Sequence, residues 1–273
     1  MQTVREDKRG KLTLRMLKDK TGYAGIVLSA EGRQALLRSD DPVELWHRLE
    51  QAAAQASKDY VGFDGARGRF LRACPAGFST PAYLADERDW KLRAKARLDA
   101  SLPMAWAVDG KDMGEAALAV YRATNLLAPF EMMRVTDLLR GASADGFLRA
   151  AARFASGGGA PALSEMAHLA KSHEAPKWTV VTYLPYLWRP EAHMFLKPEA
   201  TKDFAARVGH AFVHHYTPAL DMAVYDSLLD LAAQTEREIA DLNPCDRIDV
   251  QSFIWVVGQP DPASQPSAPA GTR

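Results

Sequence analysis

The stretch that decides the fold class is residues 11–39, KLTLRMLKDKTGYAGIVLSAEGRQALLRS. Its first half alternates apolar and polar residues at Leu12, Leu14 and Met16, and this period of two is typical of a half-buried β-strand. The glycines at positions 22 and 32 follow polar residues and indicate turns between strands. The predicted strands are 12–16, 23–28 and 33–38, which together make a small antiparallel β-meander.

A helix is expected directly after the meander. Asp41 is a favourable N-cap residue, and Pro42 suits the first helical position because it has no N–H to leave unpaired. Leu45 and Leu49 then lie four residues apart, on one helical face. We therefore predict that residues 1–57 form a β-meander followed by one helix.

The rest of the chain carries helical patterns. The predicted helices are 86–101, 113–124, 130–140, 143–155, 161–171, 199–208 and 218–241. Residues 62–84 are interpreted as a loop-rich passage. Residues 176–198 are dense in aromatics and proline, which suits a buried, kinked helix followed by a loop or a short extended piece. The predicted fold class is mainly α (α+β), with a multi-helix domain over 58–257 and a disordered tail over 258–273.

The last apolar run, IDVQSFIWVV at residues 248–257, is predicted to be a helix. Asn243 is its expected N-cap residue, and Gly258 is expected at its C-terminal cap. The residues that share its apolar face are Val250, Phe253, Ile254 and Val257. A strand would explain none of these stop signals.

A candidate polar pocket is built around this helix. Gln251 and Trp255 lie on the stripe beside the apolar face. They either pack and satisfy the backbone of a loop, or line a pocket with Asp249. The preceding HMFLKP region adds groups for an anion, unless neighbouring carboxylates neutralise them. The candidate pocket residues are His193, Lys197, Asp249, Gln251 and Trp255.

The overall composition indicates a globular protein and gives no sign of a secreted or membrane-spanning one. Hydrophobic residues make up 47% of the chain, which is ordinary for a globular protein, and Lys+Arg and Asp+Glu both number 34. Net charge alone therefore indicates no nucleic-acid partner. The N-terminus lacks the apolar core of a secretory signal, and no apolar run approaches the roughly 18 residues of a membrane span. Cys74 and Cys245 form no CxxC pair, which suits a reducing compartment. We expect a cytoplasmic protein with no membrane partner.

Charge is nevertheless segregated along the chain. Residues 67–97 contain eight Lys or Arg and three Asp or Glu, whereas residues 218–246 contain seven carboxylates and one arginine. The candidate nucleic-acid or phosphate-binding residues are Arg67, Arg69, Arg72, Arg88, Lys91 and Lys95. The alternative is that the basic and acidic faces pair with each other or with solvent.

The histidine pair His210 and His214 has a spacing that, on a helix, would let both imidazoles face one metal ion. No glutamate lies between them as in HExxH, and no third ligand has a recognisable spacing. Ordinary surface histidines are the simpler interpretation, and we predict no metal site. The sequence also lacks the GxxxxGK[ST], GxGxxG and GxSxG motifs, so no cofactor is predicted.

Several blocks resemble a family of uncharacterised bacterial proteins. The blocks are FDGARGRFLRACPAGF, DERDWKLRAKARLD, YRATNLLAPFE, KWTVVTYLPYLWRPEAHMFLKPEATKDFAARVGH and DRIDVQSFIWVV, and the similarity extends over most of residues 59–257. The resemblance implies a bacterial cytosolic protein. Its HMFLKP and IDVQSFIW blocks are similar to blocks in proteins linked to mobile DNA or restriction. It implies no activity, cofactor or catalytic residue.

The missing catalytic motifs and the charge segregation favour a non-enzymatic binding or adaptor protein, which contacts nucleic acid or a phosphate-rich partner through residues 67–97. One alternative is a metal-dependent hydrolase or nuclease of unrecognised type, which needs His193, His210, His214 and Asp249 to converge on one cavity. Another is a structural subunit of a complex, in which the aromatic segment 178–195 docks a protein partner. The sequence leaves open whether the protein is an enzyme.

Overall fold

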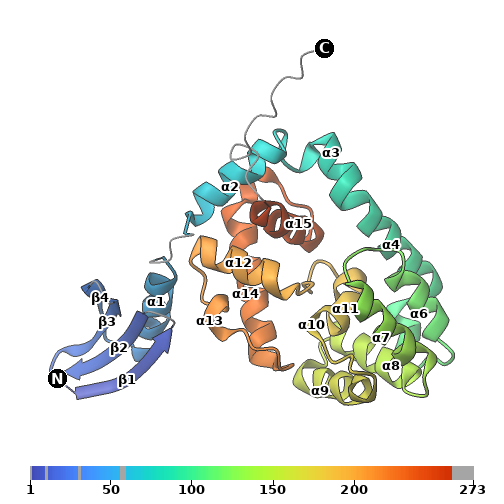
Figure 1. The fold of residues 1–273 in the computed structure, drawn as a ribbon, viewed down its shortest axis with the longest axis horizontal. Helices are drawn as coiled ribbons and strands as arrows, with labels where there is room; N and C mark the ends of the chain where they lie inside the picture. Colours follow the sequence, from blue (N-terminus) through green and yellow to red (C-terminus); the bar gives the residue numbers. More distant parts are fainter. Residues whose placement is uncertain (1, 10–11, 30–31, 56–59, 260–273) are drawn as a thin grey trace, which may run out of the picture. The chain divides into compact units, whose positions relative to one another are not determined.

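The computed structural model confirms the predicted fold class, which is mainly α with a small β part (Figure 1). It describes residues 2–9, 12–29, 32–55 and 60–259. Four strands come first in the chain, and helices follow. No helix in these described ranges is long and apolar enough to cross a membrane.

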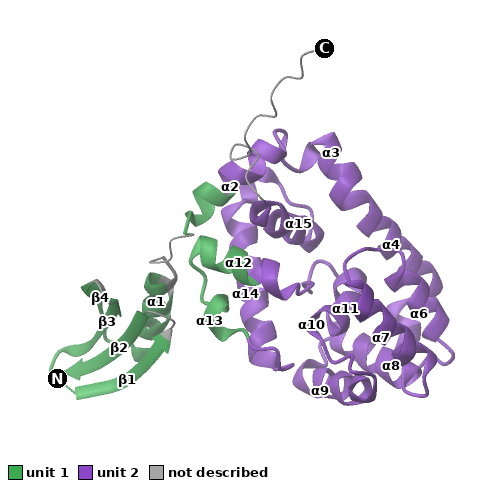
Figure 2. Cartoon of the chain, viewed as in Figure 1, with its two compact units in different colours: residues 1–66, 202–216 green, residues 67–201, 217–273 purple. Residues whose placement is uncertain are grey.

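The chain divides into two compact units, which Figure 2 colours separately. One contains residues 1–66 and 202–216, and the other contains residues 67–201 and 217–273. The boundary predicted at residues 57–58 lies outside the described residues, as does the predicted tail from residue 260 onward.

The sheet has the order β1-β2-β3-β4, and every strand is antiparallel to its neighbours. The strands are β1 (Gln2–Arg9), β2 (Leu12–Asp19), β3 (Gly22–Ser29) and β4 (Gly32–Ser39). The three predicted strands correspond to β2, β3 and β4. Gly22 has a φ of 129°, which L side chains rarely adopt, so this turn requires glycine.

Strand β1 has no counterpart in the sequence prediction. Val4 is its one apolar residue, and that side chain is 52% exposed. Backbone pairing with β2 makes this segment a strand, with a register shift between Thr3 and Arg5. The Arg5 guanidinium also lies 3.9 Å from the centroid of the Trp46 ring. Hydrophobic periodicity cannot reveal an edge strand whose side chains are almost all polar.

Helix α1 (Pro42–Gln55) covers one face of the sheet. The Asp41 carboxylate accepts hydrogen bonds from Val43 N at 2.7 Å and from Glu44 N at 3.3 Å, which confirms the predicted N-cap. Gly25 makes room for Leu49, because a Cβ at Gly25 would lie 2.5 Å from the leucine Cδ1. The resulting core consists of Leu14, Met16, Val27, Leu45, Trp46, Leu49 and Ala53.

Residues 202–216 belong to the same compact unit as the sheet. They carry most of α12 (Pro198–Val208) and all of α13 (Phe212–His215). Val61 N donates to Arg207 O at 2.8 Å, and the Phe63 ring meets the Phe204 ring edge-on with centroids 6.2 Å apart. This segment of the predicted domain 58–257 therefore groups with the N-terminal residues.

The prediction of a loop-rich passage at residues 62–84 is wrong, because most of it is helical. Its elements are α2 (Gly62–Ala73), the 3-10 turn η1 (Gly77–Ser79) and α3 (Pro81–Tyr83), and the π-helical turn η2 (Leu84–Arg88) begins at its end. The helix predicted at 86–101 is confirmed by η2 and α4 (Asp89–Ser101). Phe70 of α2 is fully buried, and its ring centroid lies 4.8 Å from that of Phe78 and 5.0 Å from that of Phe253. Burial of this face outweighs the low helix propensity of the glycines, about 1 kcal/mol each relative to alanine.

The other predicted helices are confirmed, with ends that differ by a few residues. They are α6 (Gly114–Tyr121), α7 (Pro129–Arg140), α8 (Ala144–Ala155), α9 (Gly159–Ala170), α12 and α14 (Met222–Glu238). Short elements without a prediction are α5 (Met104–Ala107), η3 (Lys171–His173) and η4 (Ala240–Leu242). Tertiary contacts define such one-turn segments, and their sequences are too short for periodicity to reveal them.

The aromatic segment is a kinked helix followed by a loop, one of the two predicted forms. Its parts are α10 (Trp178–Val181) and α11 (Tyr183–Trp188). The break is at Thr182, whose hydroxyl donates to Trp178 O at 2.6 Å. Every residue from Trp178 to Trp188 is buried, so these aromatic rings offer no surface on which a protein partner can dock.

Helix α15 (Arg247–Gly258) confirms the predicted helix but not its predicted caps. The N-cap residue is Asp246, whose Oδ1 accepts from Ile248 N at 2.9 Å, whereas Asn243 ends η4 with a φ of 54°. Gly258 is the last helical residue instead of a cap. The predicted apolar face is buried, and it consists of Val250, Phe253, Ile254 and Val257.

Candidate functional site

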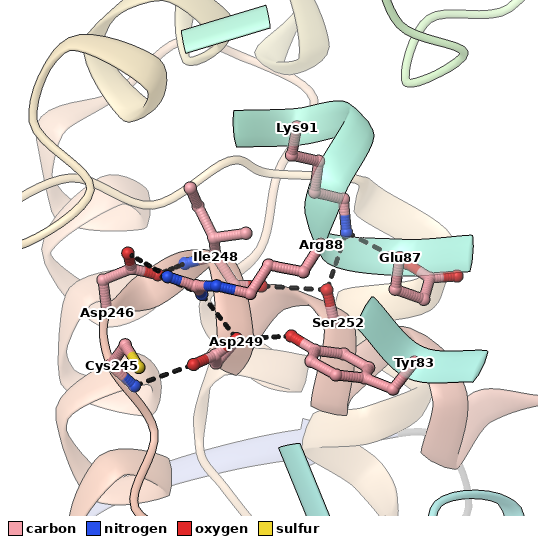
Figure 3. Close-up of polar contacts among 9 residues, drawn as sticks. All are labelled: Tyr83, Glu87, Arg88, Lys91, Cys245, Asp246, Ile248, Asp249 and Ser252. Atoms are coloured by element: carbon pink, nitrogen blue, oxygen red, sulfur yellow. Dashed lines mark hydrogen bonds and ion pairs between the residues drawn. The ribbon is translucent and has the colours of Figure 1, made fainter. Parts of the chain in front are cut away.

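A group of polar side chains lies where α15 faces the segment around η2 (Figure 3). The group, called the polar cluster here, consists of Tyr83, Glu87, Arg88, Lys91, Asp246, Asp249 and Ser252. Side chains from the two segments point toward one another in Figure 3. Tyr83, Glu87 and Lys91 follow at intervals of four residues, and the π-helical turn between them is a feature that often marks functional sites.

Asp249 is the centre of the polar cluster and is completely buried. Its Oδ1 accepts hydrogen bonds from the Tyr83 hydroxyl and from Arg88 Nη1, the latter at 2.6 Å. Its Oδ2 accepts from the backbone N of Cys245 at 2.7 Å. A buried carboxylate needs such partners, because its desolvation costs several kcal/mol. The cluster provides them.

Arg88 is held by two carboxylates. Its Nη1 and Nη2 reach the two oxygens of Asp246 at 3.1 and 3.0 Å, in addition to the contact with Asp249. Burial lowers the pKa of Arg88, but hydrogen bonds to Asp246 and the charge of Asp249 raise it above its ordinary value. Burial and the charge of Asp249 likewise raise the pKa of Tyr83. Both groups therefore keep their protons at ordinary pH, which suits a structural role better than proton transfer.

Lys91 and Ser252 form a second buried contact. Lys91 Nζ donates to Ser252 Oγ at 2.7 Å and to the Glu87 carboxylate at 3.0 Å. Burial lowers the pKa of Lys91, and the charge of Glu87 opposes this shift. A serine beside such a lysine has the composition of a nucleophile and its base. However, Ser252 is completely buried and donates to Ile248 O at 2.9 Å, so this serine lacks the access that a nucleophile needs.

A cavity of about 450 Å³ reaches the polar cluster at Asp246. Two other cavities have linings that include residues of both segments of the cluster. The larger of these two has a volume of about 390 Å³, and its lining includes Arg67, Phe78, Arg88, Asp241, Cys245 and Asp249. Burial and the charge of Asp249 raise the pKa of the Cys245 thiol, which argues against a reactive thiolate there. The smaller, called the tryptophan cavity here, has a volume of about 100 Å³, and its lining includes Glu87, Trp90, Lys91, Lys197, Gln251 and Trp255.

The predicted phosphate-binding residues do not form one basic surface. Arg88 and Lys91 are 12% and 1% exposed at their side chains and belong to the polar cluster, so they are not available to an external phosphate. Arg67 forms an ion pair with Asp241. Arg67 and Arg88 thus pair with carboxylates of the acidic stretch 218–246, as in the alternative that the sequence left open.

The remaining residues of that prediction lie nearer to solvent. Lys95 pairs with Asp99 at 2.9 Å, four residues along α4. Arg69 is half-buried and Arg72 is exposed, both on α2. Sequence alone could not distinguish these side chains from Arg88 and Lys91, because burial depends on which helix packs against them.

The tryptophan cavity brings together three residues of the predicted polar pocket, Lys197, Gln251 and Trp255. Asp249 lines the cavity of about 390 Å³ instead. Because Asp249 lies two residues before Gln251, the two side chains are about 200° apart around the helix axis. His193 lies elsewhere, with Nδ1 2.9 Å from the Tyr225 hydroxyl and Nε2 3.1 Å from Ala155 O.

The histidine pair does not have the helical spacing that the metal hypothesis assumed. His210 precedes α13, and its Nδ1 accepts from Phe212 N at 3.0 Å, whereas His214 lies within α13. In the part of the chain that the structure describes, no three His, Cys, Asp or Glu side chains are grouped so that they could hold a metal ion. His193 and Asp249, which belong to one compact unit, contact different groups: His193 contacts Tyr225 and Ala155, whereas Asp249 contacts Tyr83 and Arg88.

We expect His193 to make the protein less stable as the pH falls. Burial lowers the pKa of His193 below 6.5, although its contact with Ala155 O opposes the shift. The unfolded chain therefore binds this proton more readily. The stabilising contribution is complete above the unfolded-state pKa, about 6.5, and is lost as the pH falls through the folded-state pKa. In urea unfolding at pH 7.5 and 5.5, His193→Gln should show a smaller decline than the parent chain. Equal declines would contradict this account.

Tyr83, Glu87, Asp246 and Ser252 of the polar cluster were missed as site residues. Asp246, Asp249 and Ser252 follow at intervals of three, and Tyr83 and Glu87 are four apart, so each set lies on one helical face. These spacings are visible in the sequence. Which two faces meet is not, because it depends on packing between segments more than 150 residues apart.

The arrangement combines a compensated ionic cluster with a small cavity whose lining includes exposed and buried polar groups. This geometry suits a structural role and the binding of a ligand better than nucleophilic catalysis, because the buried serine is not accessible. Comparisons with protein-family models, with curated proteins and with solved structures find no match to this chain.

Proposed function

We propose that the protein binds double-stranded nucleic acid, without catalysis, through the face of the N-terminal sheet that α1 leaves uncovered. The observation that carries the proposal is the charge of the sheet. Residues 1–39 contain nine Lys or Arg and four Asp or Glu, a net charge of +5, in a chain whose net charge is zero. A concentrated positive charge attracts the phosphate backbone, which dominates the affinity for nucleic acid.

The uncovered face follows from the strand register. Successive side chains of a strand point to opposite faces. Leu14 and Met16 of β2 face α1, so Thr13, Arg15 and Leu17 and their cross-strand partners point away from it. The residues of this open face include Glu6, Lys8, Thr13, Arg15, Leu17, Ile26, Leu28, Arg33, Leu36 and Arg38. It combines cations with an apolar centre.

Lys8 and Arg33 are the two cations of the open face that are best placed to contact phosphates, because the other two already have carboxylate partners. Arg15 pairs with Glu6 at 2.6 Å, and Arg38 pairs with Asp19 at 3.3 Å. Lys8 and Arg33 are exposed, and neither forms an ion pair within the described ranges. They therefore present their charge to solvent.

The side chains of the open face also favour a duplex over a single strand. Residues 1–39 contain one aromatic residue, Tyr23, and it packs against the core on the α1 side. The open face therefore lacks the rings on which single-stranded bases stack. Leu36, 49% exposed, offers an apolar contact instead.

Charge reversal on the open face tests the proposal. The full chain should bind a 20-base-pair DNA duplex with an affinity that falls steeply as salt is raised, measured by fluorescence anisotropy. We expect Lys8→Glu/Arg33→Glu to weaken binding about tenfold or more at low salt. It should also reduce the slope of log affinity against log salt by about two, one for each lost phosphate contact.

The matched control is Arg93→Glu/Arg97→Glu, which reverses two exposed charges of α4 within residues 67–97. It should bind like the parent, and circular dichroism should show both variants folded. If the control loses binding while the sheet variant keeps it, the interface lies on residues 67–97 as the sequence suggested. If no duplex binds at low salt, the proposal is rejected.

A further inference from the structure

The tryptophan cavity has features of a binding site that are independent of the sheet. The first is Gln251, which lines the cavity and is 5% exposed, while its Oε1 has no hydrogen-bond partner within the described residues. Buried amide oxygens are almost always paired in native proteins, and an unpaired one is destabilising. A ligand N–H in this cavity would supply the missing donor.

The second feature is a lysine held against an aromatic ring. Lys197 Nζ lies 4.6 Å from the centroid of the Trp255 ring. Within the described part of the chain it forms no ion pair with a carboxylate. The ring positions the ammonium group through a cation–π contact and leaves its hydrogen-bond donors for an anion.

The third feature is the balance of charge around the cavity. Its lining has two cations, Lys91 and Lys197, and two carboxylates, Asp86 and Glu87. Lys91 already pairs with Glu87 at 3.0 Å. A ligand with a net charge would leave one of the remaining groups uncompensated. A neutral ligand that carries separate positive and negative groups matches both.

We propose that the tryptophan cavity binds a small free α-amino acid as its zwitterion. The carboxylate of the ligand lies against Lys197, and its ammonium donates to Gln251 Oε1 and to the carboxylates beside it. Trp90, Trp255 and Leu126 provide apolar walls for the side chain. The volume of about 100 Å³ restricts the site to the smallest amino acids.

Isothermal titration of the full chain tests the charge requirement. The probes are glycine, L-alanine and L-serine, with propionate as the analogue of alanine that lacks the ammonium and ethylamine as the analogue that lacks the carboxylate. We expect one or more of the amino acids to bind at least tenfold more tightly than either analogue. Propionate or ethylamine binding as tightly as L-alanine would overturn the proposal, as would the absence of binding by all three amino acids.

Two variants test the residues. Gln251→Leu removes the unpaired acceptor and should weaken amino-acid binding tenfold or more without lowering the melting temperature. Lys197→Met should weaken it to a similar extent, whereas Lys95→Met removes the same charge outside the cavity and should bind like the parent. Unchanged affinity in Gln251→Leu or Lys197→Met would overturn the assignment. Lys8→Glu/Arg33→Glu should keep full amino-acid binding, which separates this site from the proposed nucleic-acid interface.

Discussion

Replacing Asp249 with leucine is expected to lower the free energy of unfolding by about 3–5 kcal/mol, because it breaks a buried ionic network from its centre. The substitution removes the acceptor for the Tyr83 hydroxyl, for Arg88 Nη1 and for the backbone N of Cys245. Arg88 then keeps only Asp246, and the buried Tyr83 hydroxyl and the backbone N of Cys245 lose this acceptor. Urea unfolding at pH 7.5, followed by circular dichroism, measures the change.

Two further variants test whether the loss of stability comes from breaking the buried network or only from removing one charge. Asp241→Asn breaks the ion pair with Arg67, in which the two side chains are 52% and 40% exposed, and should cost at most about 1 kcal/mol. The triple variant Tyr83→Phe/Arg88→Met/Asp249→Leu should recover much of the loss, because it removes the polar partners together. A triple variant as unstable as Asp249→Leu alone would show that uncompensated polar groups are not the cause.

Gly114→Ala is expected to destabilise the protein by about 3 kcal/mol through overpacking. Gly114 is a buried residue at the start of α6, and a Cβ there would lie 2.0 Å from the backbone oxygen of Leu139 in α7. A backbone oxygen cannot rotate away as a side chain can, so the two helices must separate. Thermal and urea unfolding of the variant measure the loss.

The matched control is Gly146→Ala in α8. Its nearest atom would be Leu169 Cδ1 at 3.2 Å, the end of a flexible side chain. Alanine also has the higher helix propensity, so this variant should be neutral or stabilised by up to about 1 kcal/mol. Equal losses in Gly114→Ala and Gly146→Ala would contradict the steric explanation.

Local patterns in the sequence predicted those elements whose residues alternate strongly between apolar and polar. Strand β2 and helix α1 are examples, because the core residues Leu14, Met16, Leu45 and Leu49 recur at the period of their element. Strand β1 and helix α2 were missed for opposite reasons. β1 is too polar to show a pattern and is a strand because β2 pairs with it. α2 is rich in glycine and is helical because Phe70 is buried.

The candidate sites show the same division. Gln251 and Trp255 could be placed on one stripe of a helix from their spacing of four, and the structure brings both to the tryptophan cavity. The spacing did not indicate that Lys197 stacks on Trp255 or that Lys91 lies beside them. It also did not exclude Asp249 and His193, whose side chains turn to other partners.

The sequence by itself determined the mainly helical class, the small N-terminal meander, the apolar face of α15 and the charge of each segment. These properties depend on residues within a few positions of one another, so they can be read along the chain. Only the tertiary structure decided how that charge is used. Arg88 and Asp246 are 158 residues apart and form a buried pair, whereas Lys8 and Arg33 remain exposed. The identity of a residue does not specify its partner or its burial, because both arise when distant helices and strands pack together.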